Sequence, residues 1–226
     1  MASSMSTFLH FPANSHSAFS HKPFLNPNST ISNHSISPKI PNFSLSSSQS
    51  LSAKTHLLNL ISDQNRGLKT QQNPKIQSQI IDAIESLAVL GKDFITTDAS
   101  LSGTWRMLWT TEKEQLFIIK NASFFGTKVG DVLQVIDVDN LKLNNVITFP
   151  PSGVFFVRSS IEVASAQRVN FRFTSAVLRG KDWEVPLPPF GQGWFESVYL
   201  DDDIRVAKDI RGDYLVVDRA PYEWKE

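Results

Sequence analysis

The chain has 226 residues, 22 basic and 22 acidic side chains and no cysteine. Its five histidines (His10, His16, His21, His34 and His56) all lie in the first quarter, so residues 57–226 hold neither imidazole nor thiol. This excludes serine–histidine and cysteine–histidine nucleophilic pairs and the usual zinc ligands from that part of the chain. We therefore predict no catalytic residue, no metal site and no cofactor, and a binding role in place of an enzymatic one.

The N-terminal region differs in composition from the rest of the chain. Residues 1–62 contain many serines, three lysines and no acidic residue, and the first arginine is Arg66. Serine-rich, acid-free leaders are typical of organelle transit peptides, and the lack of arginine favours a plastid over a mitochondrion. We predict a disordered plastid transit peptide over 1–56, and thus a plastid location; an ordinary disordered tail is the alternative.

The remaining residues, 63–226, carry 19 basic and 22 acidic side chains, a net charge of −3. Such a balance is not that of a nucleic-acid-binding surface, and we expect no nucleic-acid partner. The length suits one domain with one core. No run of 18 apolar residues occurs, so any contact with lipid is expected at a membrane surface or inside the protein.

Two helical signals make 57–91 an N-terminal helical segment. A short apolar cluster at 57–61 ends before Gly67. Asn73 and Pro74 are then suited to the N-cap and first position of a helix, and isoleucines and leucines recur every three or four residues until Gly91. This predicts an amphipathic helix over 74–90. Its apolar face would pack on the domain that follows or on a membrane surface.

From Leu101 onward the apolar residues alternate with polar ones, as in strands that are wet on one face. The alternation and the turn signals predict eight strands, near 103–111, 131–138, 141–149, 154–164, 168–178, 194–200, 203–208 and 213–219. Short links between them favour antiparallel neighbours. We predict an all-β domain over 92–226 that closes into an up-and-down barrel, with a sandwich as the alternative.

Large apolar side chains occupy the inward positions of these strands. The candidate lining consists of Trp105, Met107, Trp109, Phe149, Phe155, Phe171 and Phe173. These residues have two interpretations: they fill the barrel as an ordinary core, or they surround a hydrophobic ligand. A packed interior without a pocket would favour a protein that contacts other proteins.

Several short blocks in the same order resemble the plastid-lipid-associated protein (fibrillin) family. They include Leu101–Thr111, Gln134–Asp137, Asn144–Val146, Ile161–Val169 and Gly193–Val206. The resemblance covers about 100–220. It implies a lipocalin-like β-barrel in plastids, associated with plastoglobules, thylakoids or stroma, and linked to isoprenoids, carotenoids, quinones and photoprotection. It implies no catalytic residues.

Within that resemblance, Gly103-Thr104-Trp105 matches the Gly-x-Trp of the first strand of lipocalin-like barrels. There the indole closes one end of the barrel and an arginine from a late strand covers its face. Arg205 or Arg219 would be that arginine.

The segment 180–193 is predicted as the long link of the barrel. Long links with aromatic residues are often functional. Trp183, Leu187 and Phe190 are therefore candidates for a membrane or partner contact, and packing across the barrel mouth is the alternative.

Three hypotheses for function remain. The first is a plastid lipid-binding protein, which holds hydrophobic small molecules or docks on lipid surfaces. The second is a protein with a solid barrel that contacts an enzyme of plastid lipid or prenylquinone synthesis. The third is an enzyme that uses carboxylates or Tyr199 and Tyr214 as acid or base. The acidic run Asp201–Asp203 lacks the spacing of a calcium loop and is predicted to be a turn.

Overall fold

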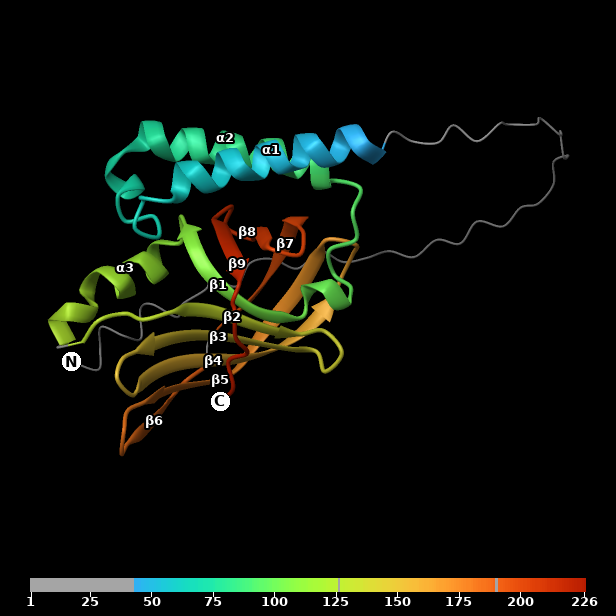
Figure 1. The fold of residues 1–226 in the computed structure, drawn as a ribbon. Coiled ribbons are helices and arrows are strands. Elements are labelled where there is room, and N and C mark those ends of the chain that lie inside the picture. The colour runs from blue at the N-terminus through green and yellow to red at the C-terminus, as the bar shows by residue number, and fades with distance from the viewer. Residues whose placement is uncertain (1–42, 126, 190) are drawn as a thin grey trace, which may run out of the picture.

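The computed structural model describes residues 43–125, 127–189 and 191–226 (Figure 1). Its helices are α1 (Phe43–Ile61), α2 (Pro74–Gly91) and α3 (Lys113–Asn121). Its strands are β1 (Gly103–Thr110), β2 (Val132–Asp137), β3 (Lys142–Phe149), β4 (Gly153–Val163), β5 (Arg168–Arg179), β6 (Glu184–Leu187), β7 (Gln192–Leu200), β8 (Ile204–Asp209) and β9 (Tyr214–Arg219). No helix in the described ranges has the length and apolar character needed to cross a membrane.

Eight of the strands form a closed antiparallel ring. The sheet order is β4-β3-β2-β1-β9-β8-β7-β5-β6, and β4 also pairs with β5, which joins the two ends. Neighbours in the ring are neighbours in the sequence, with two exceptions: β6 intervenes between β5 and β7, and the first strand β1 pairs with the last strand β9. The prediction of an antiparallel β domain preceded by helices is thus confirmed. Closure removes the exposed edges that eight open strands would leave.

The ninth strand, β6, corrects the prediction of a simple link at 180–193. The long strand β5 pairs through Arg168–Arg172 with β7 and through Ala176–Arg179 with β6. The β5–β6 hairpin therefore extends from the ring (Figure 1). The sequence did not predict β6, because Pro186 lies within it and interrupts the alternation of apolar and polar residues.

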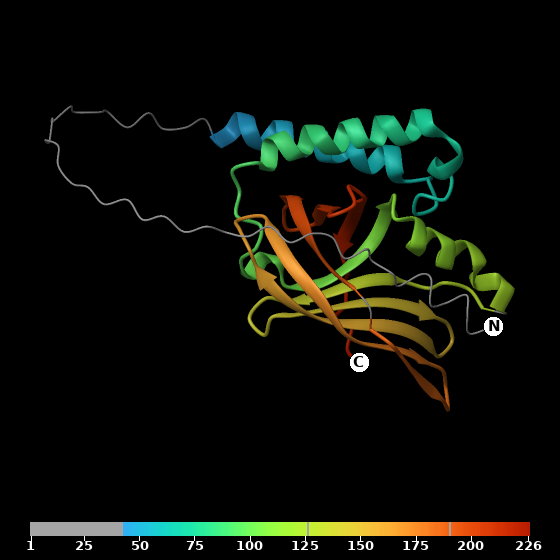
Figure 2. The ribbon, with the colours of Figure 1, turned by 180° about the vertical axis from the view of Figure 1, so that it is seen from behind.

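Three apolar clusters stabilise the fold. The first fills the ring and includes Trp105, Ile136, Leu143, Phe195 and Val217. The second lies between α1 and α2 and the outer face of β1, β7, β8 and β9, where both helices run side by side (Figures 1 and 2). In the third, Trp224 of the C-terminal tail packs against the outer face of the strands β2, β3, β4 and β5. The strands under the helices are therefore buried on both faces.

The helix α2 forms as its sequence predicts. The Oδ1 atom of Asn73 accepts a hydrogen bond from the Ile76 backbone N–H at 3.2 Å, and Pro74 occupies the first turn. Ile80, Ile84 and Leu87 are fully buried against the sheet. The sheet, and not a membrane surface, is therefore the partner of this apolar face.

The helix α1 begins at Phe43, before the boundary predicted at residue 57. Two of its residues, Leu57 and Ile61, are buried in the cluster between the helices and the sheet. Lys54 forms ion pairs with Asp201 at 2.8 Å and Asp203 at 2.7 Å. The C-terminal part of the predicted leader is thus helical and lies on the ring, while 1–42 lie outside the described residues.

A β-bulge changes the direction of Trp109. The register of β1 with β9 shifts between Met107 and Trp109, so Met107 faces the interior and Trp109 faces the helices. The Trp109 Nε1–H donates to Thr70 Oγ1 at 3.2 Å. The prediction that Trp109 lines the interior is therefore wrong. Because both faces of β1 are apolar here, the sequence pattern does not reveal the bulge.

Candidate ligand site inside the ring

A single arginine lies across the interior of the ring. Arg205 alternates on β8 with two residues of the helix-facing cluster, so its side chain points inward, and it is fully buried. Its guanidinium carbon lies 5.6 Å from the ring centroid of Trp105 and 5.4 Å from that of Phe195. One nitrogen, Nη2, donates to Oε1 of Gln134 on β2. The guanidinium thus spans the interior between β7, β1 and β2.

The charge of Arg205 is not matched by an acid. Burial lowers the pKa of its guanidinium to about 9, and no described carboxylate counters that effect. Its Nε and Nη1 atoms are buried without a hydrogen-bond partner among the described residues. A buried charge without a partner costs several kcal/mol by general estimates, roughly 3–5, and proteins normally avoid it. A pKa of about 9 still leaves the group charged at neutral pH.

Other polar side chains share the interior with Arg205. On β2, Gln134 lies two positions from each of the interior residues Val132 and Ile136, so its side chain shares their inward face. Its Nε2–H donates to Asn145 Oδ1 at 3.0 Å. The Ser159 and Ser197 hydroxyls are buried and lack a partner within the described part. The interior is therefore apolar in its walls and has hydrogen-bonding groups that are not all satisfied. The sequence pattern did not lead us to predict these inward polar groups. The position of Gln134 between two apolar inward residues could have indicated one of them.

One end of the ring is closed around Trp105. The indole is fully buried, and its Nε1–H donates to the Leu101 carbonyl at 2.8 Å. The guanidinium carbon of Arg219 lies 4.2 Å from the Trp105 ring, closer than that of Arg205. Arg219 also donates from Nη1 to the Ser102 carbonyl and from Nη2 to the Ser100 carbonyl, both at 3.0 Å. Arg219 is thus the arginine that seals this end, and Arg205 remains inside.

The opposite end is covered by α3. Ile118 and Ile119 of this helix pack on the interior cluster, together with the partly buried Phe149 and Phe155. A hollow of about 410 Å³ lies at the same end, and it is lined by Ser123, Thr127, Lys128 and Pro150.

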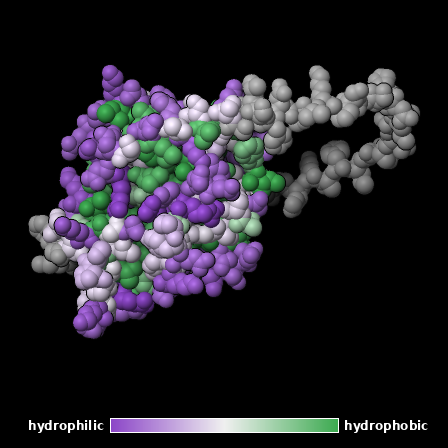
Figure 3. Space-filling model, in the orientation of Figure 1, coloured by the Kyte–Doolittle hydropathy of each residue, from purple (hydrophilic) through white to green (hydrophobic). Residues whose placement is uncertain are grey.

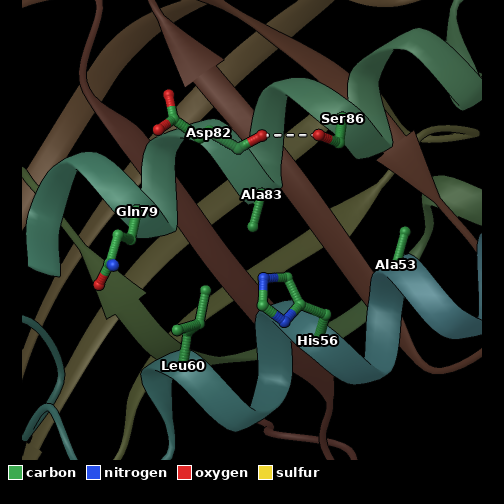
Figure 4. A pocket seen from close by; sticks show the side chains of 7 residues that line it. All are labelled: Ala53, His56, Leu60, Gln79, Asp82, Ala83 and Ser86. Carbon is green, nitrogen blue, oxygen red and sulfur yellow. Dashed lines mark hydrogen bonds between the residues drawn. The ribbon is translucent and has the colours of Figure 1, made fainter.

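A second hollow lies between α1 and α2 and not in the ring. It has a volume of about 290 Å³ and is drawn in Figure 4. His56 and Leu60 reach into it from α1, opposite Ala83 of α2, and the Ser86 hydroxyl donates to the Asp82 carbonyl at 2.8 Å. Neither this hollow nor the one at α3 is lined by the interior residues, so a ligand inside the ring requires its side chains to make room.

Of the other residues predicted to line the interior, some reach the interior cluster and some do not. Phe171 packs on the interior cluster, and its ring stacks on that of Phe173 with centroids 5.4 Å apart. Both rings are partly exposed. The structure thus brings Trp105, Met107, Phe149, Phe155 and Phe171 to the interior cluster, leaves Phe173 at its margin and places Trp109 elsewhere.

The β5–β6 hairpin carries the residues predicted as a surface contact. Trp183 is 54 % exposed and Val185 46 % exposed, whereas Leu187 is partly buried. Phe190 lies outside the described residues. In Figure 3 hydrophilic side chains dominate the face shown, and hydrophobic ones reach the surface as separate patches.

The acidic run Asp201–Asp203 forms a turn. Asp201 Oδ1 accepts hydrogen bonds from the backbone N–H groups of Asp203 and Ile204, at 2.9 and 2.8 Å. Its Oδ2 accepts from Lys54 and from the Tyr199 hydroxyl. These contacts agree with the predicted turn, and the described residues contain no group of acids and histidines suited to a metal.

Comparison with known proteins adds a family to this geometry. The sequence profile of the family PAP_fibrillin matches residues 51–218, from within α1 into β9. "Probable plastid-lipid-associated protein 11, chloroplastic" of Arabidopsis thaliana is 71 % identical over 174 residues, which are 77 % of this chain and 82 % of that protein. "Probable plastid-lipid-associated protein 12, chloroplastic", from the same plant, is 27 % identical over 176 residues, 71 % of this chain and 42 % of that protein. No solved structure matches the chain.

Proposed function

The chain belongs to the PAP_fibrillin family, and on that premise we propose that it is a non-enzymatic plastid protein whose closed ring binds a hydrophobic small molecule. The relative with 71 % identity is named as plastid-lipid-associated and chloroplastic, which supports the plastid location predicted from the leader. An isoprenoid, a carotenoid or a quinone would be the ligand, and a role in plastid lipid metabolism or photoprotection would follow from its identity.

The interior of the ring carries this proposal. Its walls are apolar, as lipid binding needs, and Trp105 with Arg219 closes one end. Arg205 Nε and Nη1 and the hydroxyls of Ser159 and Ser197 find no hydrogen-bond partner among the described residues, which is unusual in a core that only has to be stable. Met107, a flexible side chain within the interior cluster, is able to repack around a ligand.

Native mass spectrometry tests this proposal. The protein would be purified from plastid membrane extract, and its mass compared before and after lipid extraction. A stoichiometric quinone, carotenoid or other prenyl lipid supports a carrier function. A protein that is empty in every preparation argues for the second candidate.

The second candidate is a docking protein with a solid ring, and the β5–β6 hairpin favours it. Trp183 and Val185 are exposed on a hairpin that extends from the ring, where they are free to contact an enzyme or a plastoglobule or thylakoid surface. A Trp183→Ala, Val185→Ser double variant would lose association with plastid-lipid vesicles or with such an enzyme. Its thermal stability should stay close to that of the parent protein, because both side chains are about half exposed and lie outside the three apolar clusters.

A further inference from the structure

The chemistry of the ligand is suggested by the unmatched charge of Arg205. The guanidinium has five N–H donors, and only those of Nη2 have an acceptor among the described residues. One N–H on Nε and two on Nη1 therefore remain for another acceptor in the interior. A neutral apolar side chain of similar size would avoid this cost, since replacing buried charges by apolar residues is often neutral or stabilising.

We infer that the ring binds an amphipathic lipid whose terminal carboxylate pairs with Arg205, while the apolar chain of the lipid extends toward α3. This inference rests on the proposed function, because it needs the interior to accept a ligand. It goes beyond that function by assigning a carboxylate head group, which quinones and carotenes lack, and by naming Arg205 as the residue that binds it.

The position of Arg205 sets the orientation of the ligand. Arg205 lies near Trp105, which belongs to the closed end, and it also contacts Gln134. Beyond it, toward α3, the walls are formed by apolar residues such as Met107, Ile147 and Phe155. A carboxylate at the closed end and an apolar chain toward α3 would match the polar and apolar parts of the interior.

One charge is available, and this favours a carboxylate over a phosphate or diphosphate. Arg205 is the one cation buried in the described interior, and Arg219 is committed to carbonyls at the closed end. A group with two or more negative charges would leave a buried charge unmatched, which is costly. A monovalent carboxylate would be neutralised by Arg205 alone, and charge-assisted hydrogen bonds to it are stronger than neutral ones.

The test compares a fluorescent fatty acid with its ester. The full-length protein would be titrated at pH 7.5 with cis-parinaric acid and with its methyl ester. The ester is the more hydrophobic of the two, so apolar burial alone would favour it. A pair with Arg205 predicts instead that the acid binds at least about ten-fold more tightly, from the worth of hydrogen bonds to charged groups.

Two variants assign the effect to Arg205. Arg205→Met should abolish the preference for the acid, so that the acid no longer binds more tightly than the ester. Arg172→Gln is the matched control, because Arg172 is an exposed residue of β5 and its loss removes one positive charge from the outside. This control should retain the preference for the acid. Arg205→Gln is the second variant should Arg205→Met fail to fold.

The outcomes separate this inference from the proposed function. If neither probe binds, the inference is wrong, while the proposed function is decided by the native mass spectrometry of the protein from plastid extract. If acid and ester bind equally well to the parent protein, or if Arg205→Met keeps the preference for the acid, the ring is a lipid site but Arg205 does not recognise a carboxylate. The comparison on the parent protein decides the question even if neither variant folds.

Discussion

The guanidinium of Arg219 covers the indole of Trp105 at 4.2 Å and at the same time occupies the space beside Gly103. A Cβ atom at Gly103 would lie 2.5 Å from Nη1 of Arg219, and the backbone φ there is +145°. A residue with a side chain at position 103 would therefore displace the arginine and strain the backbone. The first strand begins with glycine because the closed end of the ring needs Arg219 at this place.

Gly103→Ala should lower the free energy of unfolding by about 2 kcal/mol or more, from backbone strain and loss of the Arg219 contacts together. Gly212→Ala is the control. Its φ of +81° is also unfavourable for alanine, but no atom lies within 4 Å of the added Cβ. It should cost only about 1 kcal/mol. Urea unfolding of both variants measures the difference. If both variants lose the same free energy of unfolding, the contacts of Arg219 do not depend on the empty space beside Gly103.

The helix α1 is predicted to be an integral part of the folded protein. Leu57→Ala should cost about 2–5 kcal/mol, because Leu57 is fully buried between the helices and the sheet. Leu51→Ala, on the same helix, should change the stability by less than about 0.5 kcal/mol, since Leu51 is 61 % exposed. Thermal or urea unfolding compares them. Equal, small effects would mean that α1 does not pack on the ring in solution.

Glu112 is predicted to make the stability depend on pH. Burial and the nearby Asp209 raise the pKa of its carboxyl from 4.5 to about 7 in the folded protein. The folded protein keeps this proton up to about pH 7, whereas the unfolded chain loses it near pH 4.5. The contribution of Glu112 to stability therefore falls as the pH rises from about 4.5 to about 7.

Glu112→Gln should remove that dependence. At pH 8 the variant should be more stable than the parent protein by about 1–2 kcal/mol, a value reduced for the partial exposure of the side chain, and at pH 4 the two should be alike. Glu162→Gln is the control for the loss of one negative charge, because Glu162 is exposed on β4. Urea unfolding at both pH values gives the comparison. A constant difference between pH 4 and pH 8 would contradict the role of Glu112.

The sequence predicted the parts of the fold where one face is wet. The alternation over Arg168–Arg172 of β5 and the capped helix α2 were readable, because polar residues mark their exposed faces. The strands β1 and β8 lie under the helices and are buried on both faces. Their alternation carries no signal, so the bulge before Trp109 and the inward direction of Arg205 followed only from the structure.

Met107 provides the most direct measurement of the central claim. It is the one methionine in the described residues, and it faces the interior of the ring; Met1 and Met5 lie in the leader. The protein labelled at its methionine methyl groups would be titrated with cis-parinaric acid and observed by NMR. Ligand binding inside the ring predicts that the Met107 methyl resonance shifts in saturable fashion while those of Met1 and Met5 stay in place. Saturable binding of the probe with an unchanged Met107 resonance would place the lipid on the surface and contradict a ligand site inside the ring.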